Sequence, residues 1–352
     1  MEPVPVAEVI PAPFRTKPGA PQTLDELIRV FEEQEALDNE DAVVPAKTLR
    51  LTQDATLAVD ALGGAFAFTD WSKKQLSQMV GIQWDRWFAR MSPDDQASEI
   101  NKRLWSNPGT LRVRTSRLAT KPNGVAGTLR ALVTPMFTPL PNSAVARLIQ
   151  LAFRRIDPDL RLTRYDATDK SVTYVLRIGE PFNKDHSHEV GDLWGTITMV
   201  NSDVGFRSAA LWASLVRLAC LNGLVLPVPD AQLFRRAHRR FDFGKLAAEL
   251  AERLAGLPGK LRSAARVLDE ARAVRVTDAR TVFRSILERA RVPIAFLPEV
   301  ERAYALEPGL EASAFAISQA VTRAAQRAEP EQRFELERAA GQYLENLIGD
   351  VE

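Results

Sequence analysis

The spacing of apolar residues changes twice along this 352-residue chain and divides it into three parts. Before residue 107 and after residue 241, apolar residues recur at helical spacing. Between these positions apolar and polar residues alternate, which predicts strands because successive side chains of a strand point to opposite faces. We therefore expect an α+β fold, with a central antiparallel sheet of β-β-β-α type between helical N-terminal and C-terminal regions.

Two hairpin signals lie in the central part of the chain. Residues 111–118 and 125–133 alternate on either side of Lys121-Pro122-Asn123-Gly124, and Asn-Gly between two alternating runs is a strong hairpin signal. A helix is expected over 144–155, lying across the sheet. The apolar run 215–221 fits both the helix and the strand template. The second hairpin is expected to pair residues 160–165 with residues 172–178. Two further strands are expected at 193–200 and 204–212.

With the aperiodic first residues counted separately, the chain divides into four segments. Residues 1–23 are rich in proline and small residues and lack a period, so they are expected to form a flexible arm. Residues 24–106 are expected to form a helical N-terminal region, 107–241 an α+β core, and 242–352 a helical C-terminal region. The helix expected over 24–40 is acidic and could dock on the basic surface of its own or a neighbouring subunit.

Charge is strongly segregated, although the formal net charge is only +1. Residues 100–156 contain ten Lys and Arg and no Asp or Glu. A surface with one sign of charge attracts polyanions, and a nucleic-acid backbone is the obvious one. The alternative is that acidic residues from elsewhere in the chain neutralise this stretch.

A second basic concentration covers residues 235–240, where four arginines occupy six positions. It could grip phosphates or form a charged helix start at a domain boundary. Together with the acid-free stretch and neighbouring arginines it gives the candidate nucleic-acid-binding residues: Arg103, Arg112, Arg114, Arg117, Lys121, Arg130, Arg207, Arg217, Arg235, Arg236, Arg239 and Arg240.

Signatures of enzymes are missing from the sequence. It has no Gly-rich phosphate loop, Rossmann glycine fingerprint, Gly-x-Ser-x-Gly elbow or His-Glu-x-x-His motif. The single cysteine, Cys220, excludes an internal disulfide. One polar cluster could bind a divalent metal ion or could simply be a loop tip, and it consists of Asp185, His186, His188, Glu189 and Asp192. We expect no catalytic residue, no cofactor and no metal.

The sequence also gives an expectation about localisation. No stretch approaches the roughly 18 consecutive apolar residues that span a bilayer. The first residues carry Glu2 and Glu8 where a signal peptide would carry Lys or Arg. The protein is expected to be cytoplasmic.

Three motifs carry a resemblance to a known family: Asn201-Ser202-Asp203-Val204-Gly205, the Arg-x-x-Cys-x-Asn segment from Arg217 to Asn222, and the arginine-histidine cluster at 235–240. Their order resembles the core of the phage- and plasmid-like family called domain of unknown function 932. The resemblance covers about residues 112–241, roughly a third of the chain, and by itself implies no chemistry.

A looser resemblance, in topology and charge, is to the β-β-β-α core of single-strand annealing proteins of the Red-beta, RecT, Erf and eukaryotic recombination-mediator types. It implies a homo-oligomeric ring or filament that holds single-stranded DNA in a basic groove without nucleotide hydrolysis. We accordingly expect ATP-independent single-stranded DNA binding and annealing in recombination or repair. The alternatives are a protein-interaction or anti-defence factor of a mobile element, with an acidic protein partner, and a metal-dependent nuclease using the cluster at 185–192.

Overall fold

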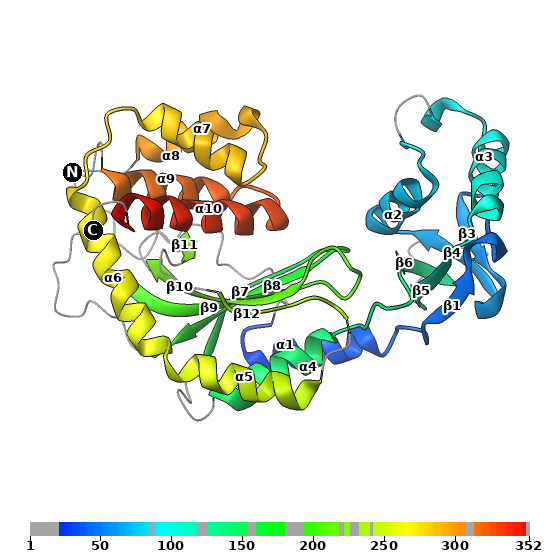
Figure 1. The fold of residues 1–352 in the computed structure, drawn as a ribbon, viewed down its shortest axis with the longest axis horizontal. Coiled ribbons are helices and arrows are strands. Elements are labelled where there is room, and N and C mark those ends of the chain that lie inside the picture. The colour runs from blue at the N-terminus through cyan, green and yellow to red at the C-terminus, as the bar shows by residue number, and fades with distance from the viewer. Residues whose placement is uncertain are drawn as a thin grey trace, which may run out of the picture.

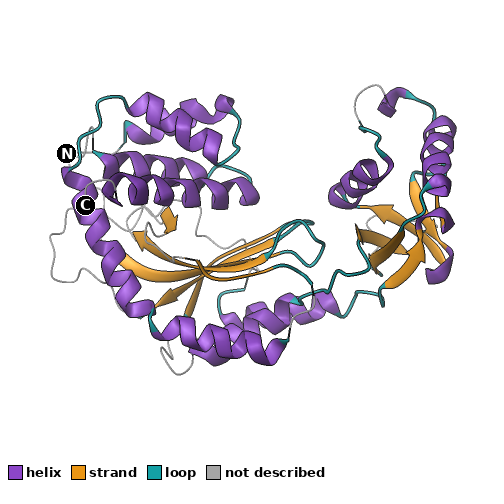
Figure 2. Ribbon diagram, viewed as in Figure 1, coloured by secondary structure: helices purple, strands orange, loops and turns teal. Residues whose placement is uncertain are grey.

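The computed structural model describes most of the chain and shows an α+β protein with two sheets and a helical C-terminal region (Figure 2). This confirms the expected fold class, while the single central sheet is wrong. The described residues are 21–84, 88–117, 125–153, 160–179, 193–217, 222–225, 232–239, 242–306 and 313–349.

The helices and strands follow one another along the chain as labelled in Figure 1. The helices are α1 (Leu24–Glu35), α2 (Asp70–Val80), α3 (Pro93–Ser106), α4 (Asn142–Phe153), α5 (Phe243–Ala255), α6 (Leu257–Ala273), α7 (Ala279–Arg289), α8 (Leu297–Tyr304), α9 (Ala314–Ala325) and α10 (Pro330–Gly349). The strands are β1 (Ala42–Pro45), β2 (Leu49–Leu51), β3 (Thr56–Val59), β4 (Gly64–Phe68), β5 (Thr110–Ser116), β6 (Gly127–Val133), β7 (Arg161–Ala167), β8 (Val172–Ile178), β9 (Leu193–Asn201), β10 (Ala209–Arg217), β11 (Asn222–Val225) and β12 (Gln232–Arg236).

The first sheet contains six strands in the order β1-β5-β6-β4-β3-β2. Neighbouring strands are antiparallel, except that β4 and β6 pair in parallel. The pairing of β5 with β6 confirms the first predicted hairpin, whose turn residues lie outside the described part of the chain. Helices α2 and α3 pack against this sheet (Figure 1), and Leu57, Phe66, Ile100 and Val113 are buried between them.

The expectation of an entirely helical N-terminal region is wrong, because residues 42–68 form the four strands β1 to β4. The run from Leu57 to Phe68 is apolar on all sides, and such a run fits a buried strand as well as a helix. The local signal for strands is Gly63, which follows a short 3-10 turn with a φ of 68° and directly precedes β4. A positive φ of this size favours glycine.

The second sheet is an antiparallel meander in the order β7-β8-β9-β10. Two short strands, β11 and β12, pair one after the other along the free edge of β10. The pairing of β7 with β8 confirms the second predicted hairpin, and β9 confirms the strand expected at 193–200. In the run 215–221, the described residues up to Arg217 belong to β10 and are therefore strand.

Helices cover both faces of the second sheet (Figure 1). On one face lie α1, α4 and α5, and Phe31 of α1 packs on Tyr174 of β8 with ring centroids 6.1 Å apart. On the other face α10 places Phe334 against Val200 and Trp212. The predicted helices after residue 242 are confirmed as α5 to α10. None of the described helices has the length and apolar character needed to cross a membrane.

The two sheets form two lobes (Figure 1). The first lobe, residues 42–133, is inserted between α1 and α4, which both belong to the second lobe. The expected boundary at residue 107 therefore falls inside the first lobe. The hairpin β5-β6 pairs with β1 and β4 from the N-terminal region, which is why it does not share a sheet with β7 and β8.

Candidate nucleic-acid interface

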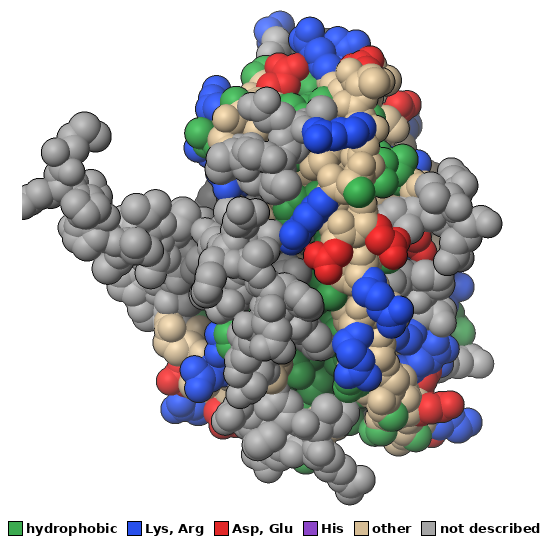
Figure 3. Space-filling view, turned by 90° about the vertical axis from the view of Figure 1, so that its left-hand side faces the viewer, with side chains coloured by type: hydrophobic (Ala, Val, Ile, Leu, Met, Phe, Trp, Pro, Cys, Tyr) green, Lys and Arg blue, Asp and Glu red, His purple; other side chains and the backbone are tan. Residues whose placement is uncertain are grey.

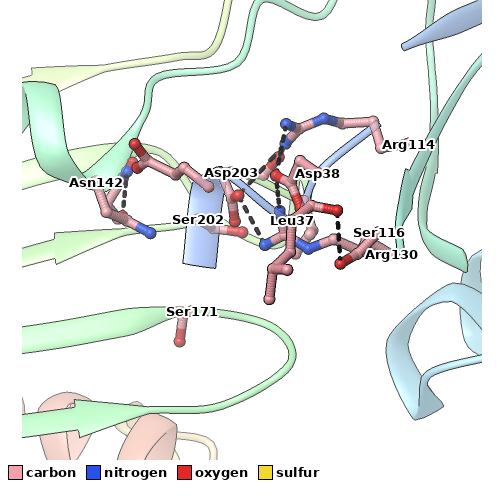
Figure 4. A network of polar contacts seen from close by, with 12 residues as sticks. Leu37, Asp38, Arg114, Ser116, Arg130, Asn142, Ser171, Ser202 and Asp203 are labelled. Carbon is pink, nitrogen blue, oxygen red and sulfur yellow. Dashed lines mark hydrogen bonds and ion pairs between the residues drawn. The ribbon is translucent and has the colours of Figure 1, made fainter. Parts of the chain in front are cut away.

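Most of the described cations in the acid-free stretch are paired with carbonyl or carboxylate oxygens. Arg112 and Arg114 of β5 and Arg130 of β6 reach carboxylates that follow α1 or lie between β9 and β10 (Figure 4). We call this set the interlobe ion cluster, and it consists of Asp38, Asp41, Arg112, Arg114, Arg130 and Asp203.

Arg114 is at the centre of the interlobe ion cluster, and its side chain is only 9% exposed. Its Nε lies 3.0 Å from Oδ1 of Asp41, and its Nη1 lies 3.5 Å from Oδ2 of Asp203 and also donates to the Asp203 carbonyl. Arg130 pairs with Asp38 and places Nη2 2.8 Å from Oδ2 of Asp203. Burial raises the pKa of Asp38, and the charge of Asp203 acts in the same direction, while Arg130 and Arg114 oppose it. These arginines are therefore already neutralised within the chain.

The turn containing Asp203 joins the two lobes. The Asn201 side chain donates to the Leu140 carbonyl (2.9 Å), next to the start of α4. The Val204 carbonyl accepts from Trp71 Nε1 (3.0 Å) and from Gln75 Nε2 (3.1 Å), both on α2. The Asn-Ser-Asp-Val-Gly motif noted in the sequence thus has a structural role, which is to hold the first lobe against the second.

Three other predicted residues, Arg103, Arg117 and Arg236, are also paired within the chain. Arg103 pairs with Glu99 and donates to the Val80 carbonyl. Arg117 donates to the carbonyl of Ala36 at the end of α1, and Arg236 pairs with Glu249 of α5. The side chains of Lys121, Arg217 and Arg240 lie outside the described residues, as do Asp185, His186, His188, Glu189 and Asp192. Among the residues that are described, no three potential metal ligands cluster.

Two of the remaining predicted arginines, Arg207 and Arg235, line a cleft between the second sheet and α10. This cleft, of about 580 Å³, lies next to β10 and β12 and is lined by Arg207, Arg235, Arg291 and Arg338. Glu335 is the one acidic residue among its described lining residues. We call it the arginine cleft. It combines residues from four places in the chain, and a concave surface of one sign concentrates anions.

Arg207 is the most buried cation of the arginine cleft. Its side chain is 15% exposed, and its closest carboxylate among the described residues is Glu335, at 3.9 Å. The guanidinium lies over the rings of Phe206 and Phe334, at 5.0 and 5.7 Å from their centroids. Burial lowers the pKa of Arg207, against the attraction of Glu335 and Glu331. An arginine with so distant a counter-ion gains more from a bound anion than one held in a close ion pair.

Arg291 has an unusual backbone conformation. It follows α7 with a φ of 55°, its N–H donates to the Glu288 carbonyl, and the N–H of Val292 donates to the Leu287 carbonyl. This hydrogen-bond pattern ends many helices, and the left-handed position in it is usually glycine. Here it carries an exposed arginine that lines the arginine cleft. The chain therefore places a cation at this position at a cost in backbone energy.

Aromatic rings accompany the arginines. Phe206 and Trp212 are half-buried and line the arginine cleft, and Phe334 packs edge-on against Trp212 with centroids 6.2 Å apart. The indole N–H of Trp212 is buried and has no hydrogen-bond acceptor among the described residues. Aromatic rings beside arginines are the combination on which single-stranded nucleic acids stack.

A second hollow lies between the lobes and adjoins the arginine cleft. This interlobe cavity, of about 470 Å³, shares Phe206, Arg207 and Ser208 with the cleft. His238 and Arg239, which follow β12, line it as well. His238 is buried and stacks on Phe137 with centroids 5.0 Å apart. Burial lowers the pKa of His238, so the imidazole is neutral at neutral pH.

The basic helix α6 offers a comparison surface. On the side of the molecule shown in Figure 3, Lys and Arg side chains are mixed with Asp and Glu. On helix α6, Arg262 and Arg266 are exposed, and Asp269 and Glu270, which follow on the same helix, are exposed too. The mixture of signs makes this side a weaker attractor of anions than the arginine cleft.

The structure thus brings together three of the predicted residues, Arg207, Arg235 and Arg239, around two adjoining hollows. It adds Arg291 and Arg338, which the sequence reasoning missed. The sequence does contain a signal for Arg291. A helix is expected to end just before Val292-Pro293, and the residue at such an end is usually glycine, yet here it is an arginine. Arg338 is one of two arginines on α10 and carries no local signal. The chain matches no protein-family model, no curated protein and no solved structure.

Proposed function

We propose that this protein binds single-stranded DNA in the arginine cleft, without nucleotide hydrolysis. The observation that carries the proposal is the convergence of Arg207, Arg235, Arg291 and Arg338 on one concave surface, where Glu335, the one acidic residue among the described lining residues, pairs with Arg338 at 2.7 Å. Arginine suits this role because its planar guanidinium donates to two phosphate oxygens at once. The buried residues of the interlobe ion cluster are excluded from it, since their charges are already paired.

A single strand fits the arginine cleft better than a duplex does. The half-buried rings of Phe206 and Trp212 lie among the arginines, and bases can stack on such rings only when they are unpaired. Contacts of this kind do not read the sequence, which leaves base edges accessible to a second strand. Annealing of complementary strands by a homo-oligomer, the activity that the resemblance to annealing proteins implies, is the finer form of this proposal.

The test is a salt titration of binding to a fluorescent single-stranded oligonucleotide. The double variant Arg235→Ala/Arg291→Gly removes two exposed charges from the arginine cleft, and Arg262→Ala/Arg266→Ala removes two from α6 as the matched control. Each lost phosphate contact reduces the slope of log affinity against log salt by about 0.7 for single strands, so the cleft variant is expected to lose about 1.4. The control is expected to keep the wild-type slope.

Other outcomes point to the alternatives. Equal slopes in the two double variants would remove the arginine cleft from nucleic-acid binding. Failure of the wild type to bind DNA, together with tight binding of polyglutamate that the cleft variant loses, would indicate an acidic protein partner. Degradation of the oligonucleotide on addition of Mg²⁺ or Mn²⁺ would indicate a nuclease. Mass measurement in solution, with and without the oligonucleotide, tests the oligomer.

A further inference from the structure

The interlobe cavity continues from the arginine cleft and has a different chemical character. Phe206, Arg207 and Ser208 line both, so a chain bound in the cleft passes the mouth of the cavity. The Arg207 guanidinium stacks over Phe206 at this junction. A phosphate held by Arg207 would therefore have its attached nucleoside within reach of the cavity.

The walls of the interlobe cavity are mostly apolar. The first lobe contributes Met79, Leu111, Leu132 and Val133, and Phe137 follows β6. Such walls accept the flat face of a base. Polar groups stand beside them: Thr134 is exposed, Ser208 is half-buried and Arg239 is exposed. They could contact the polar edge of a base or its sugar.

The interlobe cavity is an open hollow large enough to receive one nucleobase. Its volume of about 470 Å³ lies within the usual range for small-molecule pockets. The two lobes approach closely at Gly205, where an added Cβ would lie 3.0 Å from Cγ1 of Val133 and 3.5 Å from Phe137. Gly205 also has a φ of 81°, so a side chain is disfavoured there on two grounds.

We propose that the interlobe cavity receives one unstacked nucleobase of the single strand whose phosphates occupy the arginine cleft. The inference rests on the proposed function and adds a site to it. Extruding one base from a single strand costs only its stacking on its neighbours, and this cost is replaced by contacts with Phe137, Phe206 and the aliphatic walls. Because both lobes form the cavity, binding of the base also depends on how the lobes are arranged. The interlobe ion cluster holds them in that arrangement.

The experiment compares two short strands of equal charge, one fully abasic and one abasic except for a single central thymine. The wild type is expected to bind both through phosphates, with the thymine raising affinity about five-fold or more, the low end for stacking of one base. Thr134→Trp places an indole at the rim of the cavity, away from the arginine cleft, and is expected to remove the gain while leaving the affinity for the abasic strand unchanged. Met136→Trp, an exposed position two residues away that does not line the cavity, is the matched control and is expected to keep the gain.

The outcomes separate the two proposals. Loss of binding to the fully abasic strand in the wild type would refute the arginine cleft itself. Binding of that strand without a gain from the thymine, or a gain that survives in Thr134→Trp, would overturn the base site alone. Val133→Phe narrows the cavity at the neighbouring lining residue and gives a second test if Thr134→Trp fails to fold, which circular dichroism and thermal melting would show.

Discussion

Replacing Arg114 by methionine is the sharpest test of how the two lobes are held together. The substitution keeps an unbranched apolar stem and removes a guanidinium that lies 3.0 Å from Asp41, 3.5 Å from Asp203 and 3.8 Å from Asp38. Three partly buried carboxylates then share Arg130 and Arg112. Removing one partner from a buried ion pair costs about 3–5 kcal/mol, mostly because the other charge stays buried without compensation.

The matched control is Arg147→Met, which breaks an ion pair with Glu32 in which the arginine is 56% exposed. Exposed pairs contribute about 0–1 kcal/mol, so the two variants differ chiefly in burial. In urea denaturation followed by tryptophan fluorescence, a loss of about 4 kcal/mol with an m-value of about 2 kcal/mol/M lowers the midpoint by about 2 M. The control is expected to shift it by less than about 0.5 M.

The pH dependence of the Arg114→Met defect provides a second readout. Burial raises the pKa of Asp38 in the folded chain, so the unfolded chain releases that proton first as the pH rises. Protonation of the carboxylate at low pH removes the uncompensated charge, and the difference between Arg114→Met and wild type is expected to shrink on acidification. Equal midpoints for Arg114→Met and Arg147→Met, or a defect that grows at low pH, would refute the reasoning.

Three further predictions concern single residues. Glu337→Gln leaves the buried Arg164 guanidinium beside a neutral amide in place of the carboxylate whose oxygens lie 2.5 and 2.9 Å away. The variant is expected to lower the unfolding free energy by about 3–5 kcal/mol in the same urea assay. A loss below about 1 kcal/mol would mean that Asp166 compensates the charge of Arg164. Burial lowers the pKa of His238, so the unfolded chain takes up the proton first and the wild type is expected to lose stability as the pH falls below about 6.5. His238→Phe is expected to remove this loss. Identical pH profiles of the melting temperature in the variant and the wild type would contradict the prediction. Arg291→Gly alone is expected to leave the unfolding free energy unchanged or raise it by up to about 1 kcal/mol, because glycine fits the positive φ at this position. The slope of log DNA affinity against log salt is expected to fall by about 0.7. A destabilised variant would show that the arginine has a structural role.

Local structure was largely predictable from neighbouring residues. The alternation around Asn123-Gly124 predicted the pairing of β5 with β6, and the alternation over 160–165 and 172–178 predicted the pairing of β7 with β8. These features depend on backbone preferences and hydrogen bonds within a few residues, which a sequence displays directly. The strands β1 to β4 were missed because an apolar run without a clear period specifies burial and leaves the type of element open.

The positions of the charges were decided by the tertiary structure. Arg114 is 89 residues from Asp203 and 73 from Asp41, and no local pattern links them, yet folding pairs them and removes the largest basic stretch from the candidate site. Conversely, Arg207, Arg235, Arg291 and Arg338 look unrelated in the sequence and meet at one cleft. The sequence alone determined how much positive charge the chain carries and which short segments are helix or strand. Which cations remain available for a partner depends on contacts between distant segments, because Coulomb interactions act through space between whichever charges the fold brings together.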